Sequence, residues 1–159
     1  MSESVGARQA QILVAAGGSA LLLLGALAFQ YIGGLYPCQM CIWQRWPHGA
    51  AIAIGAVAIA LPGIARPLAV LGLLAALTTA GIGVFHAGVE QGWWEGVTAC
   101  ASGQDIGSVS TEDLLAQIME APVIRCDEIA WSFLGLSMAA WNAVLSLVLA
   151  AVWWQAARR

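Results

Sequence analysis

Long uncharged stretches dominate this chain and are separated by short polar segments. Four of them lack any Asp, Glu, Lys or Arg, at 12–29, 46–61, 67–85 and 129–154. Each approaches or exceeds the roughly 20 residues that a helix needs to cross hydrocarbon. Only helices can pair their own backbone groups within spans this short. The pattern predicts membrane helices at approximately 11–32, 42–61, 67–86 and 129–154, with connecting loops at approximately 33–41 and 87–128.

The composition excludes an ordinary soluble domain. Of 159 residues, 60% are hydrophobic and only 9% are charged, whereas soluble domains carry about 25% charged residues. The chain shows no internal repeat and no long polar linker, so we expect a single membrane domain over 1–159. Short connections favour antiparallel neighbours. The predicted fold is an all-α membrane protein, a four-transmembrane-helix up-and-down bundle.

The first stretch has one alternative interpretation, a cleaved signal peptide. Ala26-Leu27-Ala28 resembles a cleavage site, and only Arg8 is basic before it. The apolar run is longer than the roughly 7 to 15 residues usual for such a region. A retained helix is therefore favoured.

The long loop at 87–128 is acidic. It contains eight of the nine acidic residues, which indicates an exposed segment. Within it, Ser110-Thr111-Glu112-Asp113 resembles a helix cap, and apolar residues then recur on one face until Pro122. This predicts a short amphipathic helix, lying on the membrane surface or packed against the loop itself. The pairs Trp93-Trp94 and Trp153-Trp154 are expected to be interfacial anchors.

The basic residues predict the orientation. An even number of spans puts both termini and the loop at 62–66 on one side. That side holds four of the six basic residues, namely Arg8, Arg66, Arg158 and Arg159. Positive charge favours the cytoplasmic side, so we expect cytoplasmic termini and outward-facing loops that carry all four cysteines.

The motif Cys38-Gln39-Met40-Cys41 lies at the outer end of the second helix, after a turn formed by Gly33-Gly34 and Pro37. The exposed N–H groups and the dipole at a helix N-terminus stabilise a thiolate. Cys41 is the better placed of the two. The spacing thus predicts a redox-active pair.

A second pair, Cys100 and Cys126, lies in the long outward loop. An oxidising compartment permits a disulfide there, and a purely structural bridge is one interpretation. Two outward pairs also suit exchange, in which a thiolate attacks a neighbouring disulfide.

Metal chemistry is less well supported. Four cysteines can form a closed zinc site, but 25 residues separate the second pair, which lacks the usual knuckle spacing. A c-type haem site requires histidine directly after the second cysteine, where this chain has Ile42. We expect no metal centre.

Three polar residues follow the motif on its helix face. Gln44, Arg45 and His48 lie three, four and seven positions after Cys41. Ionisable groups facing a membrane bundle are usually functional, which favours a role for Arg45 over snorkelling. His48 is either a polar interfacial residue or a further member of the site. His86, at the outer end of the third span, is either an anchor or a second contributor to the same site.

The segment 37–45, Pro-Cys-Gln-Met-Cys-Ile-Trp-Gln-Arg, joined to the outward pair Cys100 and Cys126, resembles the DsbB family of disulfide-bond formation proteins. The resemblance implies a thiol oxidase of the bacterial inner membrane with periplasmic cysteines. Cys100 would form the mixed disulfide with a DsbA-like thioredoxin-fold protein, and Cys126 would pass reducing equivalents to Cys38. Cys41 would face a membrane quinone supported by Arg45, with His86 as a looser match.

Redox potentials agree with electron transfer from a DsbA-like protein to a quinone. A DsbA-like protein has a potential near −120 mV, so glutathione pools at roughly −180 to −320 mV could not reoxidise it. A quinone, either ubiquinone or menaquinone, fits as the cofactor. The expected partners are thus the DsbA-like protein, membrane lipid and quinone, with no nucleic acid.

Two rival functions stay open. A vitamin K epoxide reductase-like protein also places a C-x-x-C beside a quinone in a helical bundle. A non-enzymatic membrane protein could instead hold a metal with its cysteines and His48 or His86. A substrate assay with purified protein would test the first alternative. Elemental analysis of the purified protein would test the second.

Overall fold

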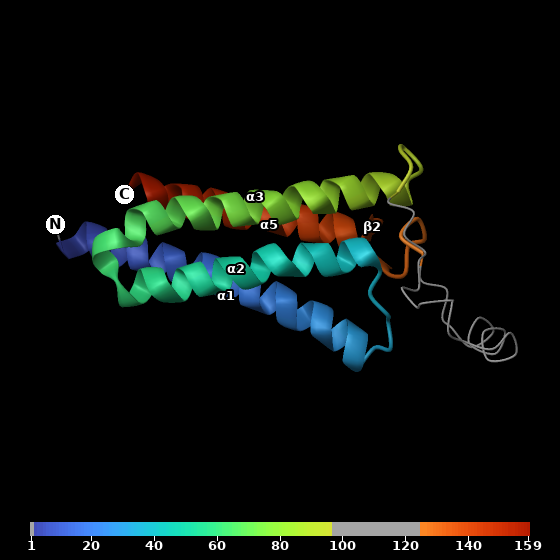
Figure 1. The fold of residues 1–159 in the computed structure, drawn as a ribbon, viewed down its shortest axis with the longest axis horizontal. Helices are drawn as coiled ribbons and strands as arrows, with labels where there is room; N and C mark the ends of the chain where they lie inside the picture. Colours follow the sequence, from blue (N-terminus) through green and yellow to red (C-terminus); the bar gives the residue numbers. More distant parts are fainter. Residues whose placement is uncertain (1, 97–124) are drawn as a thin grey trace, which may run out of the picture.

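The computed structural model describes residues 2–96 and 125–159. Four long helices lie side by side in an antiparallel bundle: α1 (Ser2–Tyr31), α2 (Gln39–Ala60), α3 (Ala65–Glu90) and α5 (Met138–Arg158) (Figure 1). A short 3-10 helix, η1 (Pro62–Ile64), joins α2 to α3. Within these described ranges, the predicted up-and-down four-helix bundle is confirmed.

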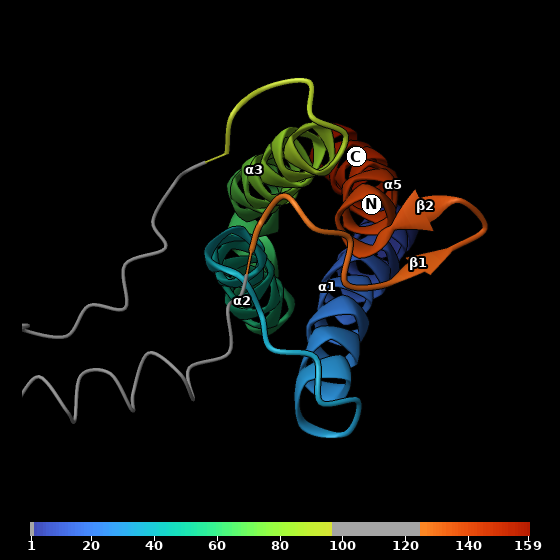
Figure 2. The same ribbon diagram turned by 90° about the vertical axis from the view of Figure 1, so that its right-hand side faces the viewer.

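Each helix packs mainly against two neighbours. α1 and α3 occupy opposite corners of the bundle, and each contacts both α2 and α5 (Figure 2). Both chain termini lie at one end of the bundle, and the segments before α2 and α5 lie at the other. We call the latter the cysteine end, because Cys38 and Cys126 lie there.

Three segments are long and apolar enough to cross a membrane by length and composition: Val5–Tyr31, Pro62–Glu90 and Met138–Arg158. The fourth helix, α2, falls outside this group. Its first half carries Gln44, Arg45 and His48, which lower its hydropathy. The same polar residues that weaken α2 as an apolar span lie at the candidate site.

Small side chains let the helices approach closely away from the cysteine end. The core there is mostly alanine, with two large residues, Ile12 and Trp153, that are fully buried. Membrane helices pack in this way because van der Waals contact between close backbones replaces the hydrophobic drive available in water.

One predicted anchor is wrong. Trp153 is 0% exposed and packs over Gly72 of α3, whereas Trp154 is 52% exposed. Neighbouring residues on a helix point about 100° apart, since 3.6 residues complete one turn. Only one member of the pair can therefore face outward.

The last helix begins later than the fourth uncharged stretch. It was expected from 129 but starts at Met138, after a hairpin of β1 (Ser132–Phe133) and β2 (Leu136–Ser137). Leu134 and Gly135 turn the hairpin with φ of 51° and 80°. The Ser137 hydroxyl then caps α5 by accepting a hydrogen bond from the Ala140 N–H at 3.2 Å. Hydrophobicity alone does not distinguish this hairpin from helix.

The amphipathic helix expected after Ser110 lies outside the described residues, as does Cys100.

The contact of Gly72 with Trp153 gives a test of the packing. A Cβ at position 72 would lie 2.6 Å from the rigid indole, so we expect Gly72→Ala to lower the free energy of unfolding by about 1–3 kcal/mol. Gly81→Ala in the same helix is the matched control, because its Cβ would meet nothing within 4 Å. Denaturation in detergent measures the free energy of unfolding of both variants. Equal stability of Gly72→Ala and Gly81→Ala would contradict the packing of Trp153 over Gly72.

Candidate active site

The first cysteine pair sits at the beginning of α2. Cys38 is the N-cap residue, and its sulfur accepts a hydrogen bond from the Cys41 N–H at 3.2 Å. The Cys38 and Cys41 sulfur atoms lie 2.9 Å apart, and both residues are free thiols. Cys38 uses the unpaired N–H groups of the first turn, as N-cap side chains commonly do. The cap thereby fixes the two sulfurs side by side.

The two thiols of this pair are not equivalent. A hydrogen bond with Cys41 and burial together raise the pKa of Cys38 to about 12. Desolvation disfavours a charged sulfur, and the neighbouring thiol adds to that effect. Cys38 is therefore the thiol of the pair that gives up its proton less readily.

Cys126 joins the pair from 85 residues further along the chain. It packs against the small cluster of Cys38, Met40 and Val89. Burial raises the pKa of the Cys126 thiol, while hydrogen bonding to the Met40 backbone opposes the rise. Three of the four predicted catalytic cysteines therefore meet at one point, and the fourth, Cys100, lies outside the described residues.

Arg45 lies one turn after Cys41 and points toward α1. Its guanidinium donates hydrogen bonds to the Gln30 side chain and to the Ala26 carbonyl. Its charge also acts on Cys41. The Nε atom is buried and has no partner among the described residues. Arg45 thus holds a fixed positive charge beside the cysteines with one donor unused.

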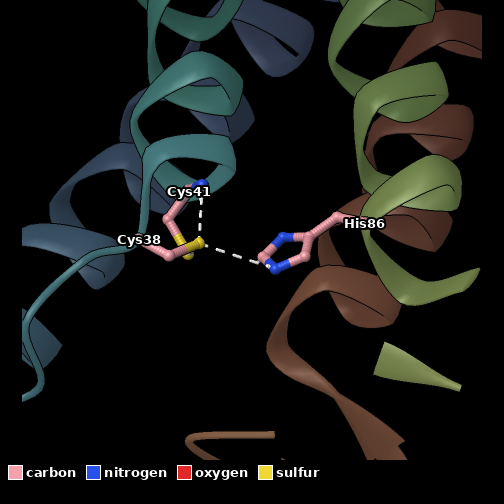
Figure 3. Close-up of side chains that lie close together, drawn as sticks. All are labelled: Cys38, Cys41 and His86. Atoms are coloured by element: carbon pink, nitrogen blue, oxygen red, sulfur yellow. Dashed lines mark hydrogen bonds between the residues drawn. The ribbon is translucent and has the colours of Figure 1, made fainter. Parts of the chain in front are cut away.

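His86 reaches the same point from α3. Figure 3 shows its ring pointing toward the Cys38 sulfur. The Nε2 atom lies 3.6 Å from that sulfur and 3.8 Å from a carboxylate oxygen of Glu90. Only 3% of His86 is exposed. His86, expected either as an anchor or as a member of the site, therefore lies beside the cysteines.

Glu90 corrects the description of the long loop as exposed. Glu90 was expected among the solvated acids of the loop, yet it is the last residue of α3 and its side chain is 6% exposed. The helix continues four residues beyond the predicted end at 86. One helical turn separates His86 from Glu90, so both side chains lie on the same face.

A buried polar network extends behind His86. Gln44 contacts the His86 Nδ1 atom at 2.9 Å and accepts a hydrogen bond from Asn142 at 2.7 Å. Asn142 also contacts Thr79 at 3.1 Å and His48 at 2.9 Å. His48 is 4% exposed, so its interpretation as an interfacial residue is wrong.

Asn142 and Thr79 were not anticipated as site residues. The signal for Asn142 was an amide within the uncharged run 129–154, where polar groups are costly and usually functional.

A cavity of about 670 Å³ opens beside these residues. It lies between α1, which diverges from α2 toward the cysteine end (Figure 1), and the other three helices. Its volume falls within the 300–1,000 Å³ typical of small-molecule sites. Phe29, Trp131, Phe133 and Trp141 form an aromatic wall, and the polar end is lined by Cys38, Cys41, Gln44, Arg45, His48, His86 and Glu90.

The sulfurs of Cys38 and Cys41 and one nitrogen of His86 also lie within 4.8 Å of one another, close enough to be considered for a metal. Soft sulfur with imidazole would suit zinc or copper. That possibility depends on whether the imidazole offers a lone pair toward the sulfurs.

The sequence matches the family model of disulfide bond formation protein DsbB over residues 8–156. This chain belongs to the DsbB family. Disulfide bond formation protein B of Methylococcus capsulatus is 37% identical, covering 87% of this chain and 90% of the relative. The protein of the same name from Polaromonas sp. is 33% identical, covering 91% and 87%. Disulfide bond formation protein B 2 of Pseudomonas aeruginosa is 34% identical, covering 80% and 78%. No solved structure matches significantly.

Membership of the DsbB family confirms the resemblance drawn from segment 37–45 and the second cysteine pair. It makes this chain a helical membrane protein of disulfide bond formation, with an oxidoreductase role.

The unequal cysteine pair gives a test. Alkylation requires the thiolate, so a thiol with a raised pKa reacts only at higher pH. We expect Cys41→Ala to move the midpoint of the Cys38 alkylation profile to lower pH, with about tenfold faster reaction at fixed pH per unit of pKa change. Peptide mass spectrometry of the reduced native protein and of the reduced variant measures the two alkylation profiles. An unchanged midpoint would contradict the influence of Cys41.

Proposed function

We propose that this DsbB-family protein is a quinone-dependent thiol oxidase that reoxidises a periplasmic DsbA-like dithiol protein. The observation that carries the proposal is the contact of Cys126 with Cys38. Thiol–disulfide exchange requires one sulfur to attack another directly. A loop cysteine held against the cap of α2 supports a relay between the two pairs, rather than two unrelated bridges.

The relay conserves electrons at each step. The partner dithiol reduces a Cys100–Cys126 disulfide and itself becomes oxidised. The Cys126 thiolate then attacks Cys38 of a Cys38–Cys41 disulfide, so that the bond to Cys41 breaks and Cys41 leaves as a thiolate. A second attack by Cys100 on Cys126 restores the loop disulfide and leaves Cys38 and Cys41 reduced. Two electrons have then moved from the partner to the first pair.

Arg45 and the helix start determine which sulfur leaves. Cys41 lies in the first turn of α2, where the helix dipole favours negative charge, and the Arg45 charge acts on it. Cys38 is at that moment bonded to Cys126, and as a free thiol it has a raised pKa, so it is the poorer carrier of negative charge. The negative charge therefore develops at Cys41, on the side of the cavity.

The cavity suits a quinone head group. Its apolar and aromatic walls match a planar ring, and Arg45 at its polar end would supply a guanidinium donor for a carbonyl oxygen. Arg45 and His86 would hold the group, with Cys41 facing it. A bound quinone would accept the two electrons and two protons that reoxidation of the first pair releases.

The decisive experiment follows quinol formation after anaerobic mixing of reduced DsbA-like protein, this protein and either ubiquinone or menaquinone. We expect Cys41→Ser to abolish quinol formation, because the pair can no longer form its disulfide. We expect Arg45→Met to slow it by about 10²-fold, the scale of losing one positioned charge, while both disulfides still form. Full turnover by Cys41→Ser would refute the relay.

Arg158→Met is the matched control for Arg45→Met. Arg158 lies at the opposite end of the bundle, where its guanidinium packs over Trp154, 5.7 Å from the ring centroid. Loss of an arginine there should leave quinol formation unchanged. Equal losses in the two variants would show a general effect of removing positive charge.

The proposed orientation places the termini in the cytoplasm and the cysteines in the periplasm. Arg66 donates a hydrogen bond to the Ala157 carbonyl, which puts two of the predicted cytoplasmic basic segments together. In cells whose cysteines have been reduced, an impermeant maleimide added from the periplasmic side should label Cys126. Labelling that appears only after the cytoplasm is exposed would invert the topology.

A further inference from the structure

The neighbours of Gln44 fix the direction of its amide. Its nitrogen lies 3.2 Å from the Met40 carbonyl oxygen, which can only accept a hydrogen bond. Its oxygen accepts a hydrogen bond from the Asn142 nitrogen at 2.7 Å. The Gln44 nitrogen is therefore the atom that faces Nδ1 of His86 at 2.9 Å, and it is the donor in that contact.

The direction of Asn142 is fixed in the same way. The Thr79 hydroxyl donates to the Gln44 main-chain oxygen at 3.1 Å, so its own oxygen is left to accept from the Asn142 nitrogen at 3.1 Å. The Asn142 oxygen then accepts from Nε2 of His48 at 2.9 Å. Along this chain of contacts, hydrogen bonds are therefore donated in one direction: from His48 to Asn142, from Asn142 to Gln44, and from Gln44 to His86.

This direction determines the tautomer of His86. A neutral imidazole has one N–H and one acceptor nitrogen, and the hydrogen bond at one nitrogen decides which is which. Because Nδ1 accepts from Gln44, the proton lies on Nε2. The Nε2 atom faces the Cys38 sulfur at 3.6 Å and Glu90 at 3.8 Å. The ring thus directs an N–H, not a lone pair, at the cysteines.

We propose that Gln44 and Asn142 are positioning residues that hold His86 in its Nε2–H tautomer, so that the ring gives the Cys38 sulfur a hydrogen-bond donor. The role of that donor rests on the proposed function, because Cys38 is the sulfur that leaves as a thiolate when Cys100 attacks Cys126 of the mixed disulfide. A donor at this place stabilises negative charge as it develops on the sulfur. The same tautomer disfavours metal binding by Cys38, Cys41 and His86, since a metal needs the Nε2 lone pair.

Nitrogen-15 NMR of histidine-labelled protein in lipid nanodiscs reads the tautomer without quinone or partner. The chain has two histidines, so a spectrum of His86→Gln assigns the remaining signals to His48. In the native protein we expect an acceptor-type shift at Nδ1 of His86 and an N–H-type shift at Nε2.

Gln44→Glu reverses the key contact. A carboxylate can accept from both Asn142 and His86 but donates to neither, so the His86 proton should appear at Nδ1. Asn142→Leu removes the donor to the Gln44 oxygen and should give a mixture of tautomers, with quinol formation slowed about fivefold, the scale of one hydrogen bond.

Gln11→Leu is the matched control. Gln11 donates to Gln155 at 3.2 Å, another interhelical amide pair, toward the end that holds the termini. Neither the spectrum of His86 nor quinol formation should change.

Two outcomes would overturn the proposal: a proton on Nδ1 of His86 in the native protein, or an unchanged spectrum in Gln44→Glu. Stoichiometric zinc in the reduced protein would do so as well. The expected spectra in a protein that forms no quinol would support the tautomer and count against the proposed function alone.

Discussion

A polar side chain inside a membrane bundle has to find its partner within the protein, because hydrocarbon offers none. In this chain, Gln44 meets that requirement. Its amide contacts its own helix through Met40, α3 through His86 and α5 through Asn142. This one side chain therefore links the three helices that surround the cysteines. The positions of His86 and Asn142 relative to Cys38 depend on it.

The two ends of the bundle are held by different means, and the cavity results from the difference. Away from the cysteines, Gly55 and Ala16 let α2 and α1 approach so closely that a Cβ on Gly55 would lie 2.4 Å from that of Ala16. At the cysteine end, α1 is held by the Arg45–Gln30 hydrogen bond and by Phe29 packing on Trp131. Long side chains keep the helices apart there, which leaves space for a ligand.

Much of the fold could be predicted because it rests on composition and periodicity. Uncharged runs gave four helices, and the Pro37–Arg45 segment indicated the site. The hairpin before α5 could not be predicted from hydropathy, because its turn depends on backbone angles at Leu134 and Gly135. Glu90 was misplaced for a related reason: α3 continues past the apolar run, so a residue assigned to the loop faces His86 instead.

The parts of the site that sequence could not supply are contacts between distant residues. Nothing near Cys126 in the chain indicates that it packs against the start of α2, and nothing near Asn142 indicates His48 or Gln44 as its partners. Spacing within one helix fixes a shared face, but only packing decides what that face meets. Cys38 is the point where these contacts converge: the cap of α2, the loop cysteine and the His86 ring all act on one sulfur. On the proposed relay, that convergence lets a single exchange at Cys38 move charge to Cys41, where Arg45 and the cavity lie.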